Sequence, residues 1–399
     1  MSGGRHEVVI VGGGTAGISV AARLRRAGVA DVAVVEPSDV HYYQPLWTLV
    51  GAGQTNVRTT ARPEASVMPK GATWIRHRAT GVDPQAHAVT LDDGTILGYE
   101  QLVLAPGLQL NFDAIPGLTE TLGRNGVSSN YRADLAPRTW EFIRQARPGT
   151  ALFVTPPGPI KCAGAPQKIA YLAADHWRRH GLLDRMRLIM VLPTAAMFSQ
   201  PDWGGVLKRV AAGYGIEVRH NTELVQVDGP NRRAVLLDTT AGTKEELDFQ
   251  VLHTAPPQSA PDWIRDSPLA DPASPYGYLK VDQYTLRHPD WPDVFALGDA
   301  ANLPTSKTGA AIRKQAPVVA ANVLAGRRGT PPVARYDGYT SCPVVTAHNR
   351  MLLAEFDYTL TPRPTFPLID TMRPRYDMYL LKRYGLPRLY WHGLLRGRA

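Results

Sequence analysis

The chain has 399 residues, which is long enough for two or three domains that each bury a core. Its two cysteines exclude a disulfide-rich secreted scaffold and any four-cysteine zinc or iron–sulfur site. The net charge is +9, and residues 372–399 hold seven Arg or Lys and one Asp, so they contribute +6 of it. No apolar run reaches the ~18–20 residues of a membrane-spanning helix, and the strand pattern that begins at once predicts no signal peptide. We therefore expect a protein of a reducing compartment.

Apolar runs and helical patterns alternate through the first 330 residues. The runs that predict buried strands are Val8–Val11, Val32–Val35, Gln101–Ala105, Ala151–Thr155, Leu188–Leu192, Val251–Thr254 and Val294–Leu297. Helical patterns occur at Ala16–Ala27, Pro166–Arg179 and Ala310–Leu324. This alternation predicts a parallel α/β architecture. From about Pro331 the sequence shows little periodicity until a helical pattern at Met378–Leu395.

A glycine-rich turn follows the first predicted strand. Gly12, Gly14 and Gly17 form a GxGxxG motif, in which glycines permit a tight turn, close approach to a pyrophosphate and close helix–strand packing. Glu36 ends the second strand, where a carboxylate can accept hydrogen bonds from the ribose hydroxyls. The unit therefore predicts a dinucleotide site, and FAD and NAD both remain open.

The second half of the chain keeps a strand and a helix but not this motif. Pro156, Pro157 and Pro159 stand in the turn where the glycines would be, and prolines remove backbone donors that a pyrophosphate needs. The strand at Leu188–Leu192 is followed by Pro-Thr-Ala rather than by an acid. We therefore expect that this domain has no NAD site and that electrons arrive by another route.

The same turn contains Cys162, just ahead of a helix with Pro166 in its first turn. A helix N-terminus and the nearby Lys161 and Lys168 would favour the thiolate. The other cysteine is Cys342. A lone cysteine is more often a small buried hydrophobic residue, but two cysteines that each lie close to proline predict a redox pair here.

The late strand at Val294–Leu297 runs into Gly298-Asp299, which resembles a motif of flavoproteins with two dinucleotide-binding domains. Ala105-Pro106-Gly107 is similar to the Ala-Thr-Gly of that family, from which Pro106 departs. The resemblance implies a glutathione-reductase-like α/β fold of two Rossmann-like domains, with Asp299 on the ribityl or phosphate oxygens of FAD. The helix after Thr308 would direct its positive end toward the flavin.

The motifs around the two cysteines, Lys161–Lys168 and Tyr339–Pro343, resemble those of sulfide:quinone oxidoreductases of the mitochondrial-like branch. Similar stretches occur at His41–Gly53, Asn302–Thr308 and Ala354–Tyr358. The resemblance implies that FAD is bound by Gly12, Gly14, Gly17, Glu36, Gln44, Pro106, Gly107, Asp299, Lys307 and Thr308, with no metal.

The same resemblance implies a mechanism. Hydrosulfide would open a bridge between Cys162 and Cys342 and leave a persulfide on Cys342, while Cys162 would pass two electrons to the flavin. A ubiquinone-like quinone would take the electrons, and glutathione, sulfite or sulfide would take the sulfur. Lys168 and Lys382 match family lysines beside the flavin and quinone, and Glu120 matches an acid proposed for proton handling. The alternatives are two surface lysines and a loop carboxylate.

Basic and aromatic residues gather at the C-terminus, a composition typical of a segment that lies on an anionic membrane surface. The alternative is a docked helix pair with a solvated basic face, and no motif supports nucleic-acid binding. We expect a FAD-binding domain at 1–112 and 270–330, a second Rossmann-like domain at 113–269 and a membrane-associating region at 331–399. The expected location is the cytoplasmic face of an inner (plasma) membrane, and homo-oligomer formation stays open.

Two other functions compete with this prediction. An NADH:quinone or disulfide oxidoreductase of the same fold would need a second GxGxxG motif or a Cys-x4-Cys pair near the first helix, and the sequence has neither. A persulfide carrier or sensor without turnover would keep the same cysteines, and steady-state sulfide consumption distinguishes it from an enzyme.

Overall fold

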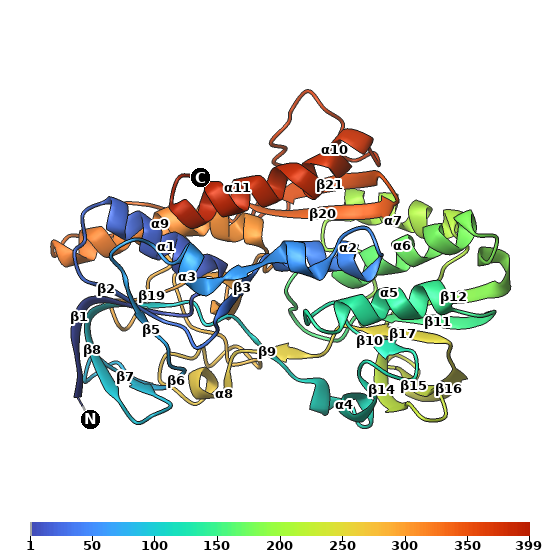
Figure 1. Ribbon diagram of the computed structural model, residues 1–399, viewed down its shortest axis with the longest axis horizontal. Coiled ribbons are helices and arrows are strands. Elements are labelled where there is room, and N and C mark those ends of the chain that lie inside the picture. Colours follow the sequence, from blue (N-terminus) through green and yellow to red (C-terminus); the bar gives the residue numbers. More distant parts are fainter. Residues whose placement is uncertain (1) are drawn as a thin grey trace.

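The first sheet forms around the strand predicted at Val8–Val11. In the computed structural model, which describes residues 2–399, this sheet has seven strands in the order β5-β2-β1-β8-β7-β6, with β19 paired to β8. Its strands are β1 (Ser2–Val11), β2 (Val32–Val35), β5 (Thr73–Ile75), β6 (Ala79–Asp83), β7 (Ala88–Leu91), β8 (Ile96–Leu104) and β19 (Val294–Ala296). Strand β1 pairs in parallel with β2 and β8, and helices α1 (Thr15–Arg26) and α9 (Gly309–Arg327) pack against each other beside it. This half of the molecule lies on the left in Figure 1.

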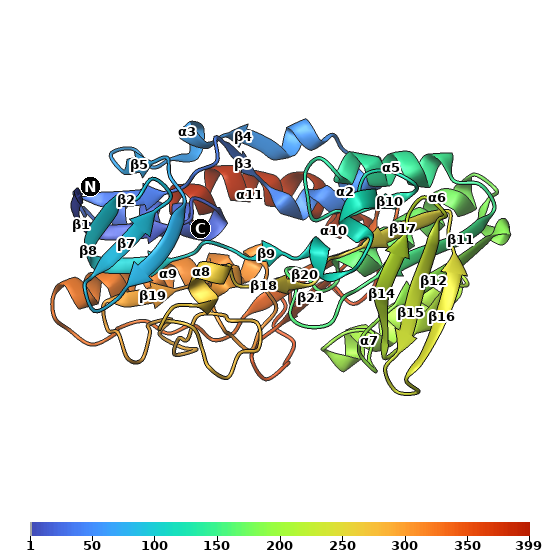
Figure 2. The same cartoon turned by 90° about the horizontal axis from the view of Figure 1, so that it is seen from below.

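The second sheet is entirely parallel and lies in the other half (Figure 1). Its order is β10 (Val127–Ser128), β17 (Val251–Thr254), β11 (Gly149–Val154), β12 (Met186–Val191) and β13 (Glu217–Arg219). Helices α5 (Ala136–Gln145), α6 (Ala165–Arg179) and α7 (Pro201–Gly213) belong to this half. A separate antiparallel sheet contains β14 (Thr222–Asp228), β15 (Arg233–Asp238) and β16 (Thr243–Asp248), as seen from below in Figure 2.

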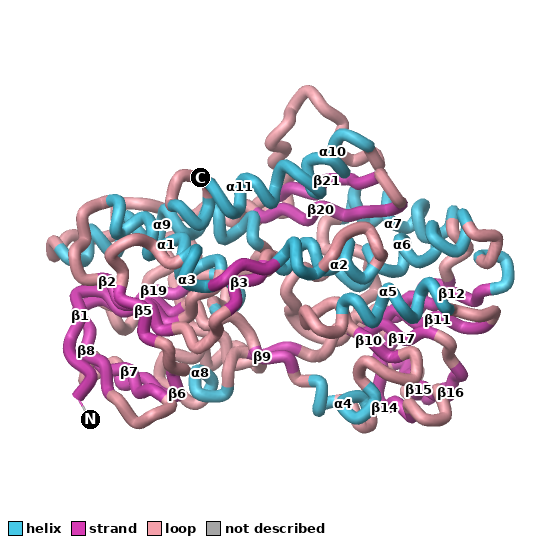
Figure 3. Tube along the Cα trace, in the orientation of Figure 1, coloured by secondary structure: helices cyan, strands magenta, loops and turns pink. Residues whose placement is uncertain are grey.

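Short elements connect these sheets. Two two-stranded pairs contain β3 (Val40–Tyr42) with β4 (Ala61–Pro63) and β9 (Gln109–Leu110) with β18 (Gln258–Ser259). Four short helices accompany them: α2 (Trp47–Gly51), α3 (Glu64–Val67), α4 (Leu118–Thr121) and α8 (Asp262–Arg265). Between α8 and β19 the chain is largely irregular (Figure 3).

The C-terminal segment lies across both halves (Figure 1). A hairpin of β20 (Thr340–Ala347) and β21 (Arg350–Phe356) packs against α6 and α9, and α10 (Tyr376–Leu380) follows. A π-helical turn at Leu381–Gly385 then leads into α11 (Leu386–His392). Trp391, Leu394 and Leu395 are buried in the same core as helix α1. Within residues 2–399 no helix is both long and apolar enough to cross a membrane.

The buried strands agree closely with the sequence prediction, but the region after Pro331 does not. Strands β2 and β17 have the predicted bounds. The hairpin β20–β21 lies where little regular structure was expected. Nearly every residue of β21 is buried, as is most of β20. Several of these buried residues are polar (Thr340, Ser341, Thr346 and Glu355), so the strands show along their length neither the alternation nor the continuous apolar run that would have identified them.

Candidate active site

Cys162 lies in the turn between β11 and α6, at a backbone φ of +53°. The left-handed region costs a residue with a side chain ~1–2 kcal/mol, so the surroundings must hold the turn. The N–H of Cys162 donates to the Lys307 carbonyl at 2.8 Å, and the Tyr131 hydroxyl donates to the Lys161 carbonyl at 3.1 Å. The N–H of Lys161 donates to Oε1 of Gln258 at 2.9 Å. The turn that carries the first cysteine is therefore held from three directions.

Cys342 reaches the same place from β20, where it is buried and paired with Ala354. Both cysteines are free thiols, and their side chains hydrogen-bond to each other. A Cβ atom on Gly164 would lie 2.9 Å from the sulfur of Cys342, so the start of α6 needs glycine to admit the second sulfur. The fold thus brings together the two cysteines that the sequence singled out.

Two lysines border the sulfur pair. Nζ of Lys168, on α6, donates to Sγ of Cys162 at 2.9 Å. Nζ of Lys382, in the π-helical turn, donates to the carbonyl of Pro45 at 3.0 Å. Both side chains belong to residues that are only 2% exposed, so the alternative of two surface lysines is wrong.

The electrostatics make the two sulfurs different. The hydrogen bond from Cys342 lowers the pKa of Cys162 well below its ordinary value, and Lys168 and Lys382 act in the same direction. The same hydrogen bond and burial raise the pKa of Cys342 well above its ordinary value. Burial would lower the pKa of Lys168, but the two sulfurs outweigh burial and raise it. Burial and the neighbouring Lys168 lower the pKa of Lys382 to about 7. The reduced pair is therefore one thiolate, at Cys162, and one thiol.

The glycine motif forms an open cradle at the start of α1. Gly12 has φ +102°, and a Cβ there would lie 2.2 Å from the carbonyl oxygen of Ala105. A Cβ on Gly17 would lie 1.8 Å from the carbonyl oxygen of Gly12, whereas nothing stands within 4 Å of one on Gly14. Gly14 is also the N-cap of α1 and makes no side-chain capping bond, so the first N–H groups of the helix stay available to a phosphate.

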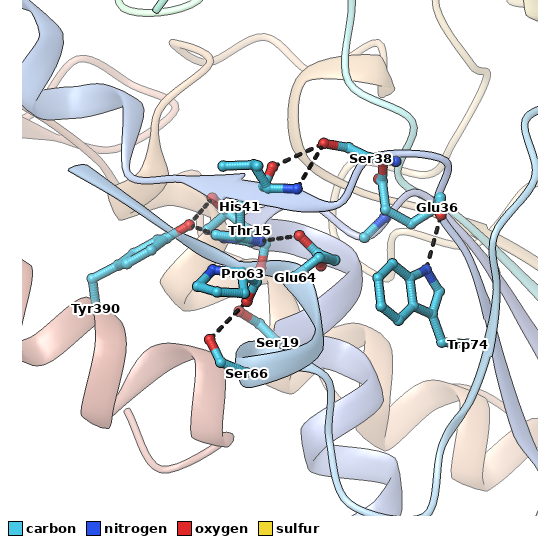
Figure 4. A network of polar contacts seen from close by, with 12 residues as sticks. Thr15, Ser19, Glu36, Ser38, His41, Pro63, Glu64, Ser66, Trp74 and Tyr390 are labelled. Atoms are coloured by element: carbon cyan, nitrogen blue, oxygen red, sulfur yellow. Dashed lines mark hydrogen bonds and ion pairs between the residues drawn. The ribbon is translucent and has the colours of Figure 1, made fainter. Parts of the chain in front are cut away.

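Glu36 lies at the end of β2 as predicted (Figure 4). Its Oε2 accepts from the N–H of Gly13 at 2.7 Å, and its Oε1 accepts from the N–H of Ser38 at 2.8 Å. Burial raises the pKa of this carboxyl, and these two hydrogen bonds oppose that effect. Each carboxylate oxygen keeps a second lone pair that a ribose hydroxyl could use.

A second group of polar residues faces the cysteine turn from the late flavoprotein motif. Burial raises the pKa of Asp299 and lowers that of Lys307 to about 8. Nζ of Lys307 donates to the carbonyls of Asp299 at 2.6 Å and Ala301 at 3.0 Å. Nζ of Lys161 donates to Oε1 of Gln44 at 2.7 Å. The Lys161 ammonium is thus hydrogen-bonded to Gln44. The sequence suggested a position beside the sulfurs for Lys161, and Lys382 occupies that position instead.

The remaining predicted cofactor residues surround the same region. Thr308 is the N-cap of α9, where its hydroxyl accepts from the N–H of Ala311 and pairs with Thr340 at the start of β20. Pro106 and Gly107 follow β8, and Gly107 has φ +76° with open space beside it. The glycine cradle, the uncapped helix and the half-buried carboxyl of Asp299 together fit FAD.

Glu120 is the one predicted residue that the fold does not bring to the site. It is exposed on the short helix α4, which packs against β14. Three residues that hold the site were missed in the sequence: Tyr131, Gln258 and Pro45. Tyr131 and Gln258 follow strands β10 and β17, and the carboxyl ends of parallel strands share one edge of a sheet. That rule could have indicated both residues.

Comparison with known proteins agrees with this arrangement. A family model described as pyridine nucleotide-disulphide oxidoreductase matches residues 6–317. The chain is 42% identical over 395 residues to the mitochondrial sulfide:quinone oxidoreductase of Dictyostelium discoideum, covering 98% of this chain and 86% of the relative. It is 40% identical to the enzyme of the same name from Mus musculus, covering 98% and 87% of the two chains.

A solved structure extends the likeness to the fold. The crystal structure of the sulfide:quinone oxidoreductase from Aquifex aeolicus superposes with a TM-score of 0.80 at 20% identity, covering 98% of this chain and 92% of that one. The chain belongs to the pyridine nucleotide-disulphide oxidoreductase family and, within it, to the sulfide:quinone oxidoreductases.

Proposed function

We propose that this chain oxidises sulfide to sulfane sulfur at the pair Cys162–Cys342 and delivers the two electrons to a quinone. The observation that carries the proposal is the contact between the Lys168 ammonium and the Cys162 sulfur, beside a second cysteine and a second buried lysine. A reductase that passes electrons from NADH through the flavin directly to a quinone needs no such sulfur pair.

The asymmetry decides which sulfur hydrosulfide attacks. In the oxidised pair, attack on Cys342 breaks the S–S bond, leaves a persulfide on Cys342 and releases Cys162 as a thiolate. A thiol with a lower pKa leaves faster, and the Lys168 ammonium lowers the pKa of Cys162. The electron pair lost by sulfide then resides on the Cys162 thiolate.

The cradle residues Gly12, Gly14 and Gly17 would hold the pyrophosphate of FAD, with Glu36 at the ribose and Asp299 at the ribityl or phosphate oxygens. When bound, FAD supplies the two-electron acceptor between the cysteine pair and the quinone. Lys307 and Thr308 hold the turn and the helix start beside it.

Sulfur leaves when a nucleophilic acceptor, such as glutathione, sulfite or sulfide, attacks the outer sulfur of the persulfide and Cys342 departs as a thiolate. The S–S bond between Cys342 and Cys162 would then form again as the pair gives up two electrons, for which bound FAD would be the acceptor. Lys382 has a pKa of about 7, so its amine can bind or release a proton near neutral pH at this step or at quinone reduction.

The exposed side of the C-terminal segment would contact the membrane that contains the quinone. Its apolar members are Tyr376, Leu380, Tyr384 and Leu389, and Arg388 adds positive charge beside them. The two relatives are named as mitochondrial proteins. We therefore shift the expected location from a plasma membrane to the inner mitochondrial membrane, with peripheral attachment in either case.

Quinone reduction by the purified full chain tests this proposal. We expect sulfide to reduce a soluble quinone analogue over many turnovers and NADH to be inactive. Activity with NADH alone would overturn the proposal. Persulfide formation without steady-state sulfide consumption would replace it with a carrier or sensor function.

A further inference from the structure

A buried chain of polar side chains joins the C-terminal helix to the start of α1 (Figure 4). The hydroxyl of Tyr390, on α11, lies 2.8 Å from the hydroxyl of Thr15 and 2.6 Å from Nε2 of His41. Nδ1 of His41 lies 3.1 Å from Oε2 of Glu64. Tyr390, His41 and Glu64 are all at most 4% exposed. The network therefore belongs to the interior and does not depend on solvent.

The donors and acceptors of this network are complementary. A carboxylate can only accept, so the Nδ1–H of His41 donates to Glu64 and leaves Nε2 as an acceptor. The phenol of Tyr390 then donates to Nε2, and the Thr15 hydroxyl donates to the phenol oxygen. Removing the single hydroxyl of Tyr390 leaves both His41 and Thr15 without their partner.

Both ends of the network meet the nucleotide cradle. Thr15 is the first residue of α1, directly after the N-cap Gly14. Oε1 of Glu64 is buried and has no hydrogen-bond partner among residues 2–399, and it lies 3.0 Å from where a Cβ on Gly13 would stand. The network thus contacts the turn that would hold a pyrophosphate from two sides, at Thr15 and beside Gly13.

The C-terminal segment is fastened to α1 at a second point. The guanidinium of Arg23, on the third turn of α1, donates to the carbonyl oxygen of Ala399. Gly397 has φ +65°, and a Cβ there would lie 3.0 Å from the backbone nitrogen of Arg23. The last residues of the chain therefore lie along the same helix whose first turn forms the cradle.

We propose that Tyr390, His41 and Glu64 are positioning residues for FAD, through which docking of α11 sets the geometry of the first turn of α1. This inference rests on the proposed flavin chemistry. Because coupling between two equilibria is reciprocal, FAD binding must in turn stabilise the docked C-terminal helix. The C-terminal segment that would contact the membrane would then form one cooperative unit with the cofactor site.

The test compares two conservative variants of the full chain. Tyr390→Phe removes the network hydroxyl, and Tyr384→Phe removes an exposed hydroxyl from the same segment. We expect the dissociation constant of FAD from the apoprotein to rise ~5–30-fold in Tyr390→Phe and to stay unchanged in Tyr384→Phe. Hydrogen exchange of the α11 amides should slow when FAD binds wild-type protein, and this slowing should shrink in Tyr390→Phe.

A double-mutant cycle separates coupling from a direct role of Thr15 in phosphate binding. The losses in FAD affinity from Thr15→Val and Tyr390→Phe should be far from additive. Additive losses would overturn the inference, as would wild-type FAD affinity in Tyr390→Phe. If Tyr390→Phe does not fold, the slowing of α11 amide exchange by FAD is compared in wild-type and Thr15→Val protein. The inference predicts a smaller slowing in Thr15→Val, and an equal slowing would overturn it.

Failure of the inference and failure of the proposed function give different results. If wild-type protein binds no FAD, the proposed function fails as well. If wild-type protein binds FAD and reduces quinone with sulfide, while the Tyr390 variant binds FAD equally tightly, only the inference fails.

Discussion

The ammonium of Lys168 lies 2.9 Å from the sulfur of Cys162, while Cys342 donates its thiol hydrogen to the same sulfur. Two chemically identical residues thereby acquire opposite tendencies: one is held as a thiolate and the other as a thiol. This difference gives the sulfur exchange a direction, because the better leaving group is fixed before sulfide arrives.

Replacing the first of these partners should weaken the thiolate. In Lys168→Met we expect the pKa of Cys162 to rise, because the opposite charge beside its sulfur is lost. The rate of alkylation at Cys162, followed by peptide mass spectrometry across pH, reports this pKa. The acidic limb of the pH–rate profile for sulfide oxidation should move to higher pH. Lys208→Met, which changes an exposed lysine on α7, is the control and should leave both unchanged. An unchanged alkylation profile in Lys168→Met would show that the ammonium does not stabilise the thiolate.

Lys382 should give the protein a characteristic pH dependence of stability. Its pKa in the folded chain is about 7, below the ordinary value of 10.5. Between about pH 7 and pH 10.5 the unfolded chain binds a proton on Lys382 that the folded chain does not bind. The free energy of unfolding should therefore rise with pH in this range. The slope from one such group is up to ~1.4 kcal/mol per pH unit. Urea unfolding should show this rise in wild-type protein and a weaker rise in Lys382→Met. Equal slopes would mean that Lys382 is not a desolvated base.

Tyr131 should matter for turnover more than for substrate binding. Tyr131→Phe removes the hydroxyl that holds the carbonyl of Lys161, so the left-handed turn at Cys162 loosens. We expect kcat to fall ~10-fold with little change in KM for sulfide, because the sulfurs are misplaced rather than lost. Tyr358→Phe, which removes a comparable bond to the Gln283 carbonyl, is the matched control. A loss of kcat of the same size in both variants would indicate a general effect on folding.

Membrane attachment should depend on the outward side of the C-terminal segment. Deleting this segment is an unsuitable test, because Lys382, Trp391 and Leu395 are buried in the protein core. The double variant Tyr384→Ser, Leu389→Ser changes only exposed side chains. We expect weaker sedimentation with anionic vesicles and unchanged reduction of a soluble quinone analogue. Undiminished vesicle binding would place the membrane contact elsewhere.

The sequence predicted those parts of the fold that rest on local pattern. Val32–Val35 and Val251–Thr254 are continuous apolar runs, and both are fully buried parallel strands with the predicted bounds. Gly12 and Gly17 indicate the turn because only glycine fits such close backbone contacts, and Gly14 leaves the space beside the start of α1 open. The hairpin that carries Cys342 was missed because buried polar residues (Thr340, Ser341, Thr346 and Glu355) and Pro343 interrupt its strands, which show along their length neither a continuous apolar run nor an alternation.

The candidate site could be predicted only in part, for a physical reason. The pair Cys162–Cys342 was predicted from the number and setting of the cysteines, the roles of Lys168 and Lys382 beside flavin and quinone came from the family resemblance, and the fold brings all four residues together. The effect of Lys168 on the Cys162 thiolate was predicted because both residues lie near the start of one helix. The effects of Cys342 and Lys382 depend on contacts across the interior, which spacing along the chain does not reveal. The bond between His41 and Tyr390 joins residues 349 positions apart, and nothing local to either residue indicates the other.

The most direct test locates the sulfur atom after a single exposure to sulfide. Oxidised full-length protein is treated with sulfide anaerobically, without acceptor, then alkylated and analysed by peptide mass spectrometry. We predict that the peptide with Cys342 gains the mass of one sulfur atom, that the peptide with Cys162 is alkylated as a simple thiol, and that Cys162→Ser gains no sulfur. Sulfur on neither cysteine, in protein that still reduces quinone with sulfide, would contradict the proposed role of the pair.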